Sequence, residues 1–512
     1  MSFKPSPFQQ AIYDEVANTD HNINVQAVAG SGKTTTLLGC LERVPAGKSV
    51  AFMAFNTSIV KELTARNTRP GVDIMTLHSY GWRCCLRRYG NGAKLDVNKS
   101  IGKVELILKR RARDPIIIDL LRRVKKGYLF NVIPRIVDLL RTSLSEPKME
   151  RVEELCEYHG IDCGTIEMEM ALEAFRLSNA DRSQFDFTDM LYVPVTDPTI
   201  RFRKYEVIMV DESQDMSVLQ HELIRRALDR RSRLITVGDP RQAIYGFAGA
   251  DATSYDKLKT LNGPSVEMPL SVCYRCGQRI VAEAAKIVPY IRPYERAIEG
   301  EVYVGSLTDL EHGDWIVCRN LRPLVEVYLW LLKNKIKSKI RGKDIGAGLI
   351  HLIEKTGAQS LRGLDRLLDL EVRKLEKKLE KKGWKNPSLS PKMTELFEKI
   401  EVIRYFIPEC RTVPALISMI EGIFTDEVKG ILLMTIHKSK GLENDVVFFL
   451  APELIPSRYA TQPWQLEQER NLKYVAISRA KTTLIYVSYD QMVKDINTSF
   501  KNGRHQNQGS RG

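Results

Sequence analysis

The segment Ala27-Val28-Ala29-Gly30-Ser31-Gly32-Lys33-Thr34 combines small residues with one lysine and one hydroxyl group. It follows an apolar run at residues 23–28 and precedes the apolar start of a helix. Small residues let backbone N–H groups approach phosphate oxygens, and the N-terminus of the following helix attracts anions. In such a loop Lys33 reaches the β- and γ-phosphates of a nucleotide and Thr34 holds Mg²⁺. Although Ala27 stands where the general pattern has glycine, we expect a triphosphate site formed by Ala29, Gly30, Ser31, Gly32, Lys33, Thr34 and Thr35.

A group of acidic residues follows a second apolar run, residues 207–210, and reads Asp211-Glu212-Ser213-Gln214-Asp215. The end of a strand in a parallel sheet directs the next residues into the ligand crevice. Asp211 is then placed to hold Mg²⁺, directly or through water. Glu212, next to it, can orient and deprotonate an attacking water molecule. The two segments together predict hydrolysis of a nucleoside triphosphate.

The composition excludes several classes of protein. The 512 residues are 43% hydrophobic and 27% charged, which supports a sizeable core and argues against wholesale disorder. The sequence contains no run of about 18 apolar residues, so we expect no membrane span. The first residues do not resemble a secretory leader. Nine cysteines, with one CxxC at Cys273 and Cys276, are too scattered for a disulfide scaffold or a zinc site. We expect reduced thiols and a cytoplasmic protein, associated with the nucleoid or, for a viral chain, in the host cytoplasm.

The net charge of +14 suggests a polyanionic partner. Ten basic residues lie between positions 99 and 126, against three acidic ones. The ten are Lys99, Lys103, Lys109, Arg110, Arg111, Arg113, Arg122, Arg123, Lys125 and Lys126. Two interpretations stay open: a solvated helical face, or a surface that neutralises phosphates and releases counterions.

Short apolar runs alternate with helical patterns along the chain, which predicts an α/β fold with parallel sheets. One set of strands is expected at 23–28, 50–55, 74–77, 207–210 and 234–237, and a second at 266–270, 315–318, 431–436, 446–450 and 484–487. The first core is expected in two parts, 1–90 and 181–264, around a basic helical insert at 91–180. The second is expected at 265–344 and 413–490, around a short helical insert at 345–412. The polar tail, 491–512, is expected to be disordered.

Further motifs occur in an order that resembles the superfamily-one helicases of the UvrD/Rep/PcrA type. The decisive segment is Gly238-Asp239-Pro240-Arg241-Gln242-Ala243-Ile244-Tyr245-Gly246-Phe247. The other matches are Ser6–Gln9 (Q motif), Ala54–Ser58 (Ia), Thr76–Gly81 (Ib), Asp186–Leu191 (the box before the acidic strand), Cys273–Arg275 (IV), Thr435–Glu443 (V) and Glu469–Ala480 (VI). The resemblance covers Ser6 to Ala480 except the two inserts. It implies that both parallel-sheet cores are RecA-like, with ATP and Mg²⁺ bound between them.

The resemblance also implies roles for individual residues at the nucleotide. Gln9 would read the adenine edge, Tyr274 would stack on its ring, and Gln242 would sense the γ-phosphate. Arg275 and Arg479 would act as arginine fingers, and Glu443 would join the ATP site. A planar, permanently charged guanidinium suits the charge that develops on a transferring phosphoryl group.

A track for single-stranded DNA is implied at nine positions: Phe55, Asn56, Thr76, His78, Tyr80, Tyr245, Phe247, Thr435 and His437. Aromatic faces stack on bases without sequence preference, and the other residues are candidates for backbone contact. For each aromatic residue a place in the core remains an alternative.

The function implied is an ATP-dependent DNA helicase that moves 3′ to 5′ on single-stranded DNA, binds single-strand/duplex junctions and is monomeric without DNA. Phe247, Ala248 and Ser478 depart from the residues usual in the family, and the second insert is short. An ATP-driven translocase that displaces proteins from DNA, and a nucleotide-switched subunit of a nuclease or defence complex, therefore stay open. RNA as the track also stays open.

Overall fold

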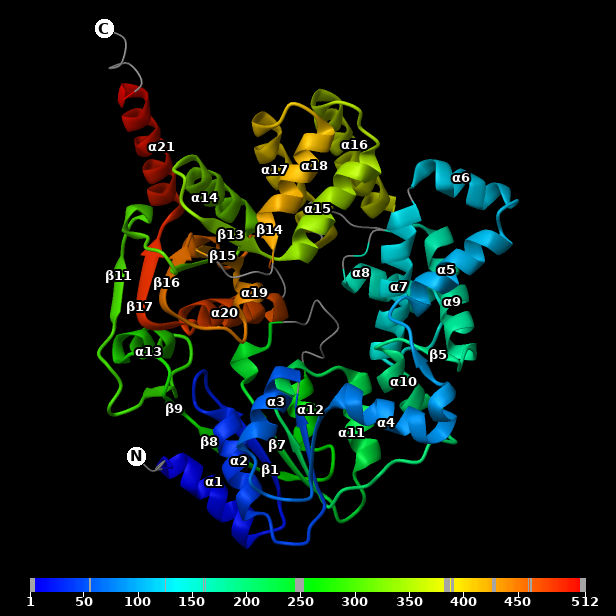
Figure 1. The fold of residues 1–512 in the computed structure, drawn as a ribbon, viewed down its shortest axis with the longest axis vertical. Coiled ribbons are helices and arrows are strands. Elements are labelled where there is room, and N and C mark those ends of the chain that lie inside the picture. The colour runs from blue at the N-terminus through cyan, green and yellow to red at the C-terminus, as the bar shows by residue number, and fades with distance from the viewer. Residues whose placement is uncertain are drawn as a thin grey trace. The chain divides into compact units, whose positions relative to one another are not determined.

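The computed structural model describes residues 5–54, 57–124, 126–159, 161, 163–244, 253–381, 387, 391–425, 430–458, 460 and 463–506. The chain forms two compact units, Met1–Val272 and Cys273–Gly512. Each contains its own parallel sheet and its own group of additional helices (Figure 1). The predicted fold class, two parallel-sheet cores each interrupted by helices, is confirmed. Among the described residues, no helix is both long and apolar enough to cross a membrane.

The first unit is built on a six-stranded sheet in the order β3-β2-β6-β7-β1-β8. Its strands are β1 (Asn22–Ala27), β2 (Val50–Ala54), β3 (Val72–Thr76), β6 (Val207–Val210), β7 (Arg233–Gly238) and β8 (Ser265–Leu270). The helices beside them are α1 (Pro7–Asn18), α2 (Lys33–Arg43), α3 (Thr57–Arg66), α4 (Leu77–Tyr89), α10 (Asp189–Thr196), α11 (Val218–Ala227) and α12 (Ser254–Lys259).

Successive side chains of the strands β2 and β6 pack into two separate apolar cores, one on each face of the sheet. Phe52 and Met209 pack with Leu37 of α2 in one core. Met53 and Val210 pack with α4, α10 and α11 in the other. Successive side chains of a strand point to opposite faces of the sheet, so helices cover both faces. The sheet is therefore buried on both sides, which explains the continuous apolar runs of β2 and β6.

Strand β8 corrects one predicted boundary. The sequence predicts residues 265–270 in the second core, but β8 pairs in parallel with β1, from Asn22 opposite Ser265 to Ala27 opposite Leu270. Without β8, strand β1 would be the edge of the sheet and its outer backbone groups would lack partners. The first unit consequently ends at Val272.

The stretch predicted as a basic insert forms α5 (Lys99–Arg110), α6 (Pro115–Arg123), α7 (Lys126–Thr142), α8 (Met149–Tyr158) and α9 (Thr165–Ala180). These helices share one apolar core that includes Ile107, Ile133 and Phe175, and they gather beside α10 in Figure 1. Two short strands absent from the prediction, β4 (Lys94–Leu95) and β5 (Gln184–Phe185), pair in parallel at the base of the insert. They join the chain entering the insert to the chain leaving it.

The second unit is built on a seven-stranded sheet in the order β11-β17-β16-β12-β15-β13-β14. The strands are β11 (Glu301–Val304), β12 (Trp315–Cys318), β13 (Ser338–Arg341), β14 (Phe424–Thr425), β15 (Ile431–Thr435), β16 (Asn444–Leu450) and β17 (Ala480–Val487). Strands β9 (Val272–Cys273) and β10 (Arg292–Pro293) form a separate pair. The helices are α13 (Gln278–Ala285), α14 (Leu321–Lys333), α15 (Lys343–Thr356), α16 (Leu361–Lys381), α17 (Pro391–Phe406), α18 (Val413–Ile423), α19 (Ile436–Ser439), α20 (Pro463–Ile477) and α21 (Tyr489–Gln506).

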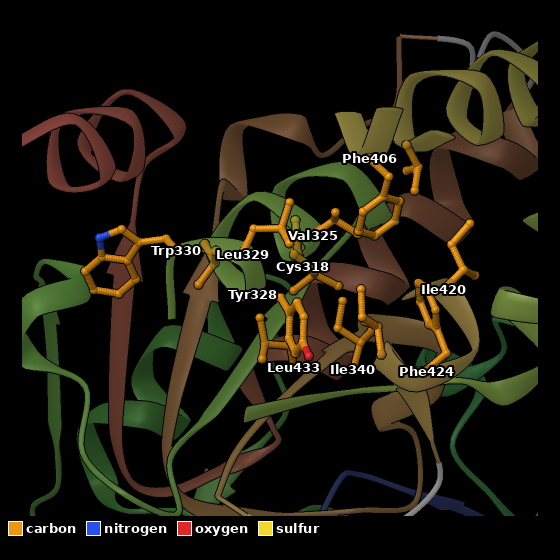
Figure 2. Close-up of a cluster of buried hydrophobic side chains, with 14 of the residues drawn as sticks. Cys318, Val325, Tyr328, Leu329, Trp330, Ile340, Phe406, Ile420, Phe424 and Leu433 are labelled. Atoms are coloured by element: carbon orange, nitrogen blue, oxygen red, sulfur yellow. The ribbon is translucent and has the colours of Figure 1, made fainter. Parts of the chain in front are cut away.

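One apolar core connects this sheet with the helices of the second insert. Figure 2 shows Val325 and Leu329 of α14 beside Cys318 and Leu433 of the sheet, with Phe406 of α17 packed on the same cluster. The insert helices are therefore part of the second unit's main core. The predicted disordered tail is wrong for residues 491–506, which belong to α21. Met492 anchors this helix because its side chain is fully buried in the same core.

Close packing of α4 on α10 makes Gly81 sensitive to substitution. A Cβ at this position would lie 1.9 Å from the Met190 carbonyl oxygen. We expect Gly81→Ala to destabilise the first unit by about 1–3 kcal/mol through overpacking. The matched control is Gly102→Ala in α5, where nothing lies within 4 Å and alanine favours the helix by about 1 kcal/mol. Thermal unfolding followed by circular dichroism compares them; equal melting temperatures would contradict the prediction.

Candidate active site

The loop between β1 and α2 is short and contains two glycines before the first residue of α2. Gly30 and Gly32 have positive φ angles of 67° and 78°, which glycine adopts without a steric cost. The Ser31 hydroxyl is turned inward and donates to the Val28 carbonyl at 2.8 Å. Gly32 precedes α2 and has no side chain that could cap its first N–H groups. A helix N-terminus with uncapped donors binds anions such as phosphate.

Lys33, the first residue of α2, points to the end of β6. Its Nζ lies 2.9 Å from Oε1 and 3.0 Å from Oε2 of Glu212. The Thr34 hydroxyl lies 3.5 Å from Oδ2 of Asp211. The structure thus brings together the lysine, hydroxyl and carboxylates that the sequence predicts, at the carboxyl ends of β1 and β6.

The backbone at Glu212 is in the left-handed region, with φ 52°. A residue with a Cβ adopts this conformation at a cost of about 1–3 kcal/mol, and such residues cluster at functional sites. Immediately before it, the Asp211 carboxylate accepts the Glu212 backbone N–H at 2.8 Å. The strained turn separates the two carboxylates, so that one faces Thr34 and the other faces Lys33.

Burial dominates the electrostatics of this site. It raises the pKa of Asp211 to about 7, and the nearby Glu212 charge adds to this effect. It also raises the pKa of Asp239, at the end of β7, to about 6. For Lys33 burial disfavours the ammonium, but attraction by Glu212, Asp211 and Asp239 outweighs it and the pKa is raised. Three carboxyl groups thus act on one ammonium group, and a bound divalent cation would favour their ionised forms.

Two glutamine side chains connect the ends of β6 and β7. Gln214 donates from Nε2 to Glu212 Oε2 at 2.6 Å and accepts the Asp239 backbone N–H at 3.0 Å. Gln242 donates from Nε2 to the Asp239 carboxylate at 2.7 Å. The predicted phosphate sensor, Gln242, is therefore linked to Glu212 through Asp239 and Gln214. The prediction gave Gln214 no role; its place two residues after Glu212 was the available signal.

Gln9 is fixed by the start of α1. Its side chain accepts the Ser6 N–H and its backbone N–H donates to the Ser6 hydroxyl, which forms a capping box. Its Nε2 donates to the Thr36 hydroxyl in α2 at 3.1 Å and lies near Gly32. Gln9 therefore contacts α2, the helix that follows the phosphate loop, and the residue is only 1% exposed.

In the second unit, Tyr274, Arg275 and Glu443 occupy neighbouring loops. The Tyr274 ring packs against Tyr294 with ring centroids 5.0 Å apart. Arg275 forms an ion pair with Glu443 and donates to the Ser478 carbonyl at 3.4 Å. The structure therefore brings residues of motifs IV, V and VI together within this unit.

Arg479 is buried among backbone carbonyls. It donates from Nε to Val475 O at 2.9 Å and from Nη1 to Leu442 O at 2.9 Å. Burial, together with the like charge of Arg275, lowers its pKa to about 10, so the guanidinium remains charged at neutral pH. Its predicted role as an arginine finger stays a prediction.

Among the predicted DNA contacts in the first unit, Thr76 and His78 lie at the start of α4. Thr76 caps the helix by accepting the Ser79 N–H. The His78 ring meets the edge of Phe187, with centroids 6.5 Å apart. Phe187 is 55% exposed, so one side of its ring is open to solvent. The sequence motif Asp186–Leu191 does not indicate a role for Phe187, because exposure cannot be read from a motif.

The prediction for Tyr80 is wrong. Its ring is 1% exposed and packs against Phe202 and Tyr205. Its hydroxyl donates to the Arg203 carbonyl at 2.7 Å. On α4 it occupies the face that packs on the sheet, so the alternative of a core aromatic residue holds. Four other predicted contacts, Phe55, Asn56, Tyr245 and Phe247, lie outside the described residues.

In the second unit, Thr435 and His437 lie at the junction of β15 and α19. Thr435 is half-buried at the N-terminus of α19. Burial lowers the pKa of His437 to about 3, and the positive charges of Arg319, Lys440 and Lys438 add to the effect. His437 is therefore neutral at physiological pH.

This shift predicts a specific loss of stability in acid. The unfolded chain protonates this histidine near pH 6.5, whereas the folded chain does so near pH 3. The stabilisation from neutral His437 is therefore complete above pH 6.5. As the pH drops below 6.5, this contribution to the unfolding free energy decreases by up to about 1.4 kcal/mol per pH unit. We expect the difference in unfolding free energy between wild type and His437→Gln to shrink between pH 6.5 and 4. A difference independent of pH in denaturant titrations would contradict this.

A phosphate loop and acidic strand ends on a parallel sheet define a P-loop α/β protein. Comparison with known protein families identifies which family of P-loop proteins the chain belongs to. Residues 8–261 match the UvrD/REP helicase N-terminal domain, and residues 329–491 match the UvrD-like helicase C-terminal domain. The chain belongs to the UvrD-like helicase family, as its motifs predicted.

Individual relatives are distant in sequence. The chain is 24% identical over 93% of its length to F-box DNA helicase 1 of Gallus gallus, covering 48% of that protein. It is 23% identical over 93% of its length to F-box DNA helicase protein 1 of Schizosaccharomyces pombe, covering 56% of it. It is 26% identical over 55% of its length to the ATP-dependent DNA helicase PcrA of Bacillus subtilis, covering 39% of it. The chain thus spans about half the length, or less, of these relatives.

Proposed function

We propose that this chain is an ATP-dependent DNA helicase that moves 3′ to 5′ along single-stranded DNA. The observation that carries the proposal is the arrangement of Lys33 with Glu212, and of Thr34 with Asp211, at the ends of β1 and β6. Membership of the UvrD-like helicase family supports the DNA substrate. The direction of movement follows from the family resemblance.

ATP fits the phosphate loop by the chemistry of its groups. The N-terminus of α2 and Lys33 supply positive charge for the β- and γ-phosphates. The Thr34 hydroxyl and the Asp211 carboxylate are hard oxygen donors of the kind Mg²⁺ prefers. When bound, the ion neutralises charge on the phosphate oxygens. In ATP-bound protein Lys33 exchanges its contact with Glu212 for phosphate, which frees the carboxylate.

Glu212 then serves as the general base. Its carboxylate accepts a proton from the attacking water as the water oxygen bonds to the γ-phosphorus and the bond to the β-phosphate oxygen breaks. Gln214 holds Oε2 of this carboxylate at 2.6 Å, so the group keeps its orientation after Lys33 leaves. Gln242, linked through Asp239, reports the state of the γ-phosphate to the same chain of hydrogen bonds.

We propose further that Arg275 and Arg479 of the second unit complete the site when the two units close on ATP. Their positive charges then stabilise the charge that develops on the transferring phosphoryl group. Hydrolysis thereby depends on closure, which couples chemistry to movement. Release of the Arg275–Glu443 ion pair would accompany this step.

For the DNA track of the first unit we propose Phe187 and His78, with Thr76 at the start of the same helix. An exposed aromatic ring stacks on any base, and the neutral His78 adds a hydrogen-bonding group, since burial lowers its pKa. Neither feature reads base edges, so movement along the strand tolerates any sequence.

The test is ATP turnover measured with and without oligo(dT), and with oligo(U) as a second strand type. A DNA motor is expected to show stimulation by oligo(dT) that Lys33→Met abolishes. Turnover that no nucleic acid stimulates would support the nucleotide-switched subunit instead. Stimulation by oligo(U) alone would assign RNA as the track. Displacement of a protein from DNA without unwinding of a partial duplex would support the translocase.

A further inference from the structure

Four charged side chains lie together inside the first unit, separate from the nucleotide-binding residues. Lys99 of α5 and Arg141 of α7 are 1% and 0% exposed. Lys99 Nζ lies 2.6 Å from Asp189 Oδ2. Arg141 lies 3.0 Å from Asp186 and 3.3 Å from Asp189. Both sequence interpretations placed Lys99 on an exposed basic surface. That placement is wrong, because Lys99 points inward to neutralise a buried carboxylate.

The two aspartates flank Phe187 in the short connection from β5 to α10: Asp186 begins the loop of residues 186–188, and Asp189 directly follows it as the first residue of α10. Within this connection each aspartate accepts the backbone N–H of the other, at 2.8 and 3.1 Å. The insert holds the loop at two more points. The Ser100 hydroxyl of α5 donates to Asp186 at 3.0 Å, and the Thr188 hydroxyl donates to Asp138 of α7 at 2.8 Å.

Phe187 lies in the middle of this loop, and its ring is 55% exposed. The residues on both sides of it, Asp186 and Thr188, are bound to α7. The two helices of the insert therefore fix the backbone from which the ring projects. Since the ring also meets His78, the loop sets the relation between two candidate DNA contacts that come from different segments of the chain.

Stability alone does not account for ionic groups at this place. Removing ions from water is costly, and apolar replacements of similar volume are often as stable. The insert also has an extensive apolar core of its own. Ion pairs and hydrogen bonds differ from apolar contacts in being directional, because they form only when donor and acceptor are correctly placed. They can therefore fix the position of the loop backbone.

We propose that Lys99, Arg141 and Thr188 are positioning residues, through which α5 and α7 of the insert hold the Phe187 ring in place to stack on a nucleobase. This inference rests on the proposed DNA track. The basic insert would thus contribute to binding of single-stranded DNA through the position of Phe187, in addition to any contribution from its surface charge.

A double-mutant cycle tests the proposal. The affinity for fluorescein-labelled oligo(dT) is measured by anisotropy for wild type, Phe187→Ala, Thr188→Val, and the double variant. Thr188→Val is nearly isosteric and leaves the four buried charges intact. We expect Phe187→Ala to weaken binding by about 5- to 150-fold, as expected for one lost base stack. Thr188→Val should weaken binding several-fold, and the double variant should bind no more weakly than Phe187→Ala. Lys99→Met is placed in a second cycle with Phe187→Ala and should behave in the same way.

The matched control is Lys103→Met, one turn along α5. Lys103 pairs with Asp181 at 2.5 Å, outside the loop. Its effect on affinity should add to that of Phe187→Ala, and nucleotide binding should be unchanged in every variant. Additive losses for Thr188→Val would overturn the inference alone. Wild-type binding by Phe187→Ala would overturn it together with the proposed place of Phe187 in the DNA track. Either result leaves the proposed helicase activity standing. Absence of binding and of DNA-stimulated turnover in the wild type would instead overturn the proposed function.

Discussion

Replacing Glu212 with glutamine should lower DNA-stimulated ATP turnover by roughly 10²–10⁴-fold, the range expected for loss of a general base. The amide keeps the size of the side chain and can still accept a hydrogen bond from Gln214, but it cannot take a proton from water. ATP binding should persist, because the phosphate loop and Lys33 are unchanged. Removing the carboxylate also frees Lys33 from its ion pair, which favours contact with phosphate.

Turnover is measured by phosphate release and binding by titration with a fluorescent ATP analogue. The matched control is Glu222→Gln in α11, where the carboxylate pairs with Arg225 and Arg226 and lies outside the proposed site. This control should retain wild-type turnover. If Glu212→Gln kept more than about a tenth of the wild-type rate, another group would have to be the base.

Replacing Arg275 with alanine should lower turnover by about 10³–10⁵-fold, the contribution of an arginine finger to phosphoryl transfer. The reason is electrostatic: Arg275 is expected to supply one of the two guanidinium charges proposed to reach the γ-phosphate when the units close. Lysine at the same position should restore only part of the rate, because an ammonium lacks the planar fork of donors.

Arg279→Ala is the matched control for this substitution. Arg279 lies four residues later, in α13, and pairs with the exposed Glu299. Its loss should leave turnover unchanged. Equal melting temperatures of Arg275→Ala and wild type would separate chemistry from folding, and near-wild-type turnover by folded Arg275→Ala would contradict the assignment.

The nucleotide site could be predicted from sequence because each of its groups follows directly from a strand. Lys33 comes at a fixed offset from β1, while Asp211 and Glu212 come at the end of β6, so a parallel sheet must bring them to the same edge. Gln214 was less visible, since its two hydrogen bonds depend on the left-handed turn at Glu212. A turn conformation at a residue other than glycine leaves no mark in the sequence.

The DNA-contacting residues were harder to predict, because the sequence does not show which aromatic side chains are buried and which are exposed. Tyr80 and Phe187 are both aromatic residues in recognisable motifs, yet one is 1% exposed and the other 55%. Helix α4 directs Tyr80 toward the sheet, whereas the loop after β5 turns Phe187 outward. The same limit applies to Lys99, whose charge suggested a surface position although its carboxylate partner, Asp189, lies 90 residues later in the chain.

Strand β8 shows the corresponding limit for the fold. Its apolar residues predict a strand, but they do not tell which of two parallel sheets receives it. Strand β8 pairs with β1, which would otherwise be the edge of the first sheet. Which strand is an edge depends on how all the strands assemble, and residues 265–270 alone do not specify it.

The most direct test of the account is unwinding of two matched partial duplexes, one with a 3′ and one with a 5′ single-stranded tail. In the presence of ATP and Mg²⁺, the chain is expected to unwind the 3′-tailed duplex and to leave the 5′-tailed duplex intact, and Glu212→Gln should unwind neither. Unwinding of only the 5′-tailed duplex would contradict the proposed direction. Failure to unwind either duplex, without DNA-stimulated ATP turnover, would contradict the proposed motor.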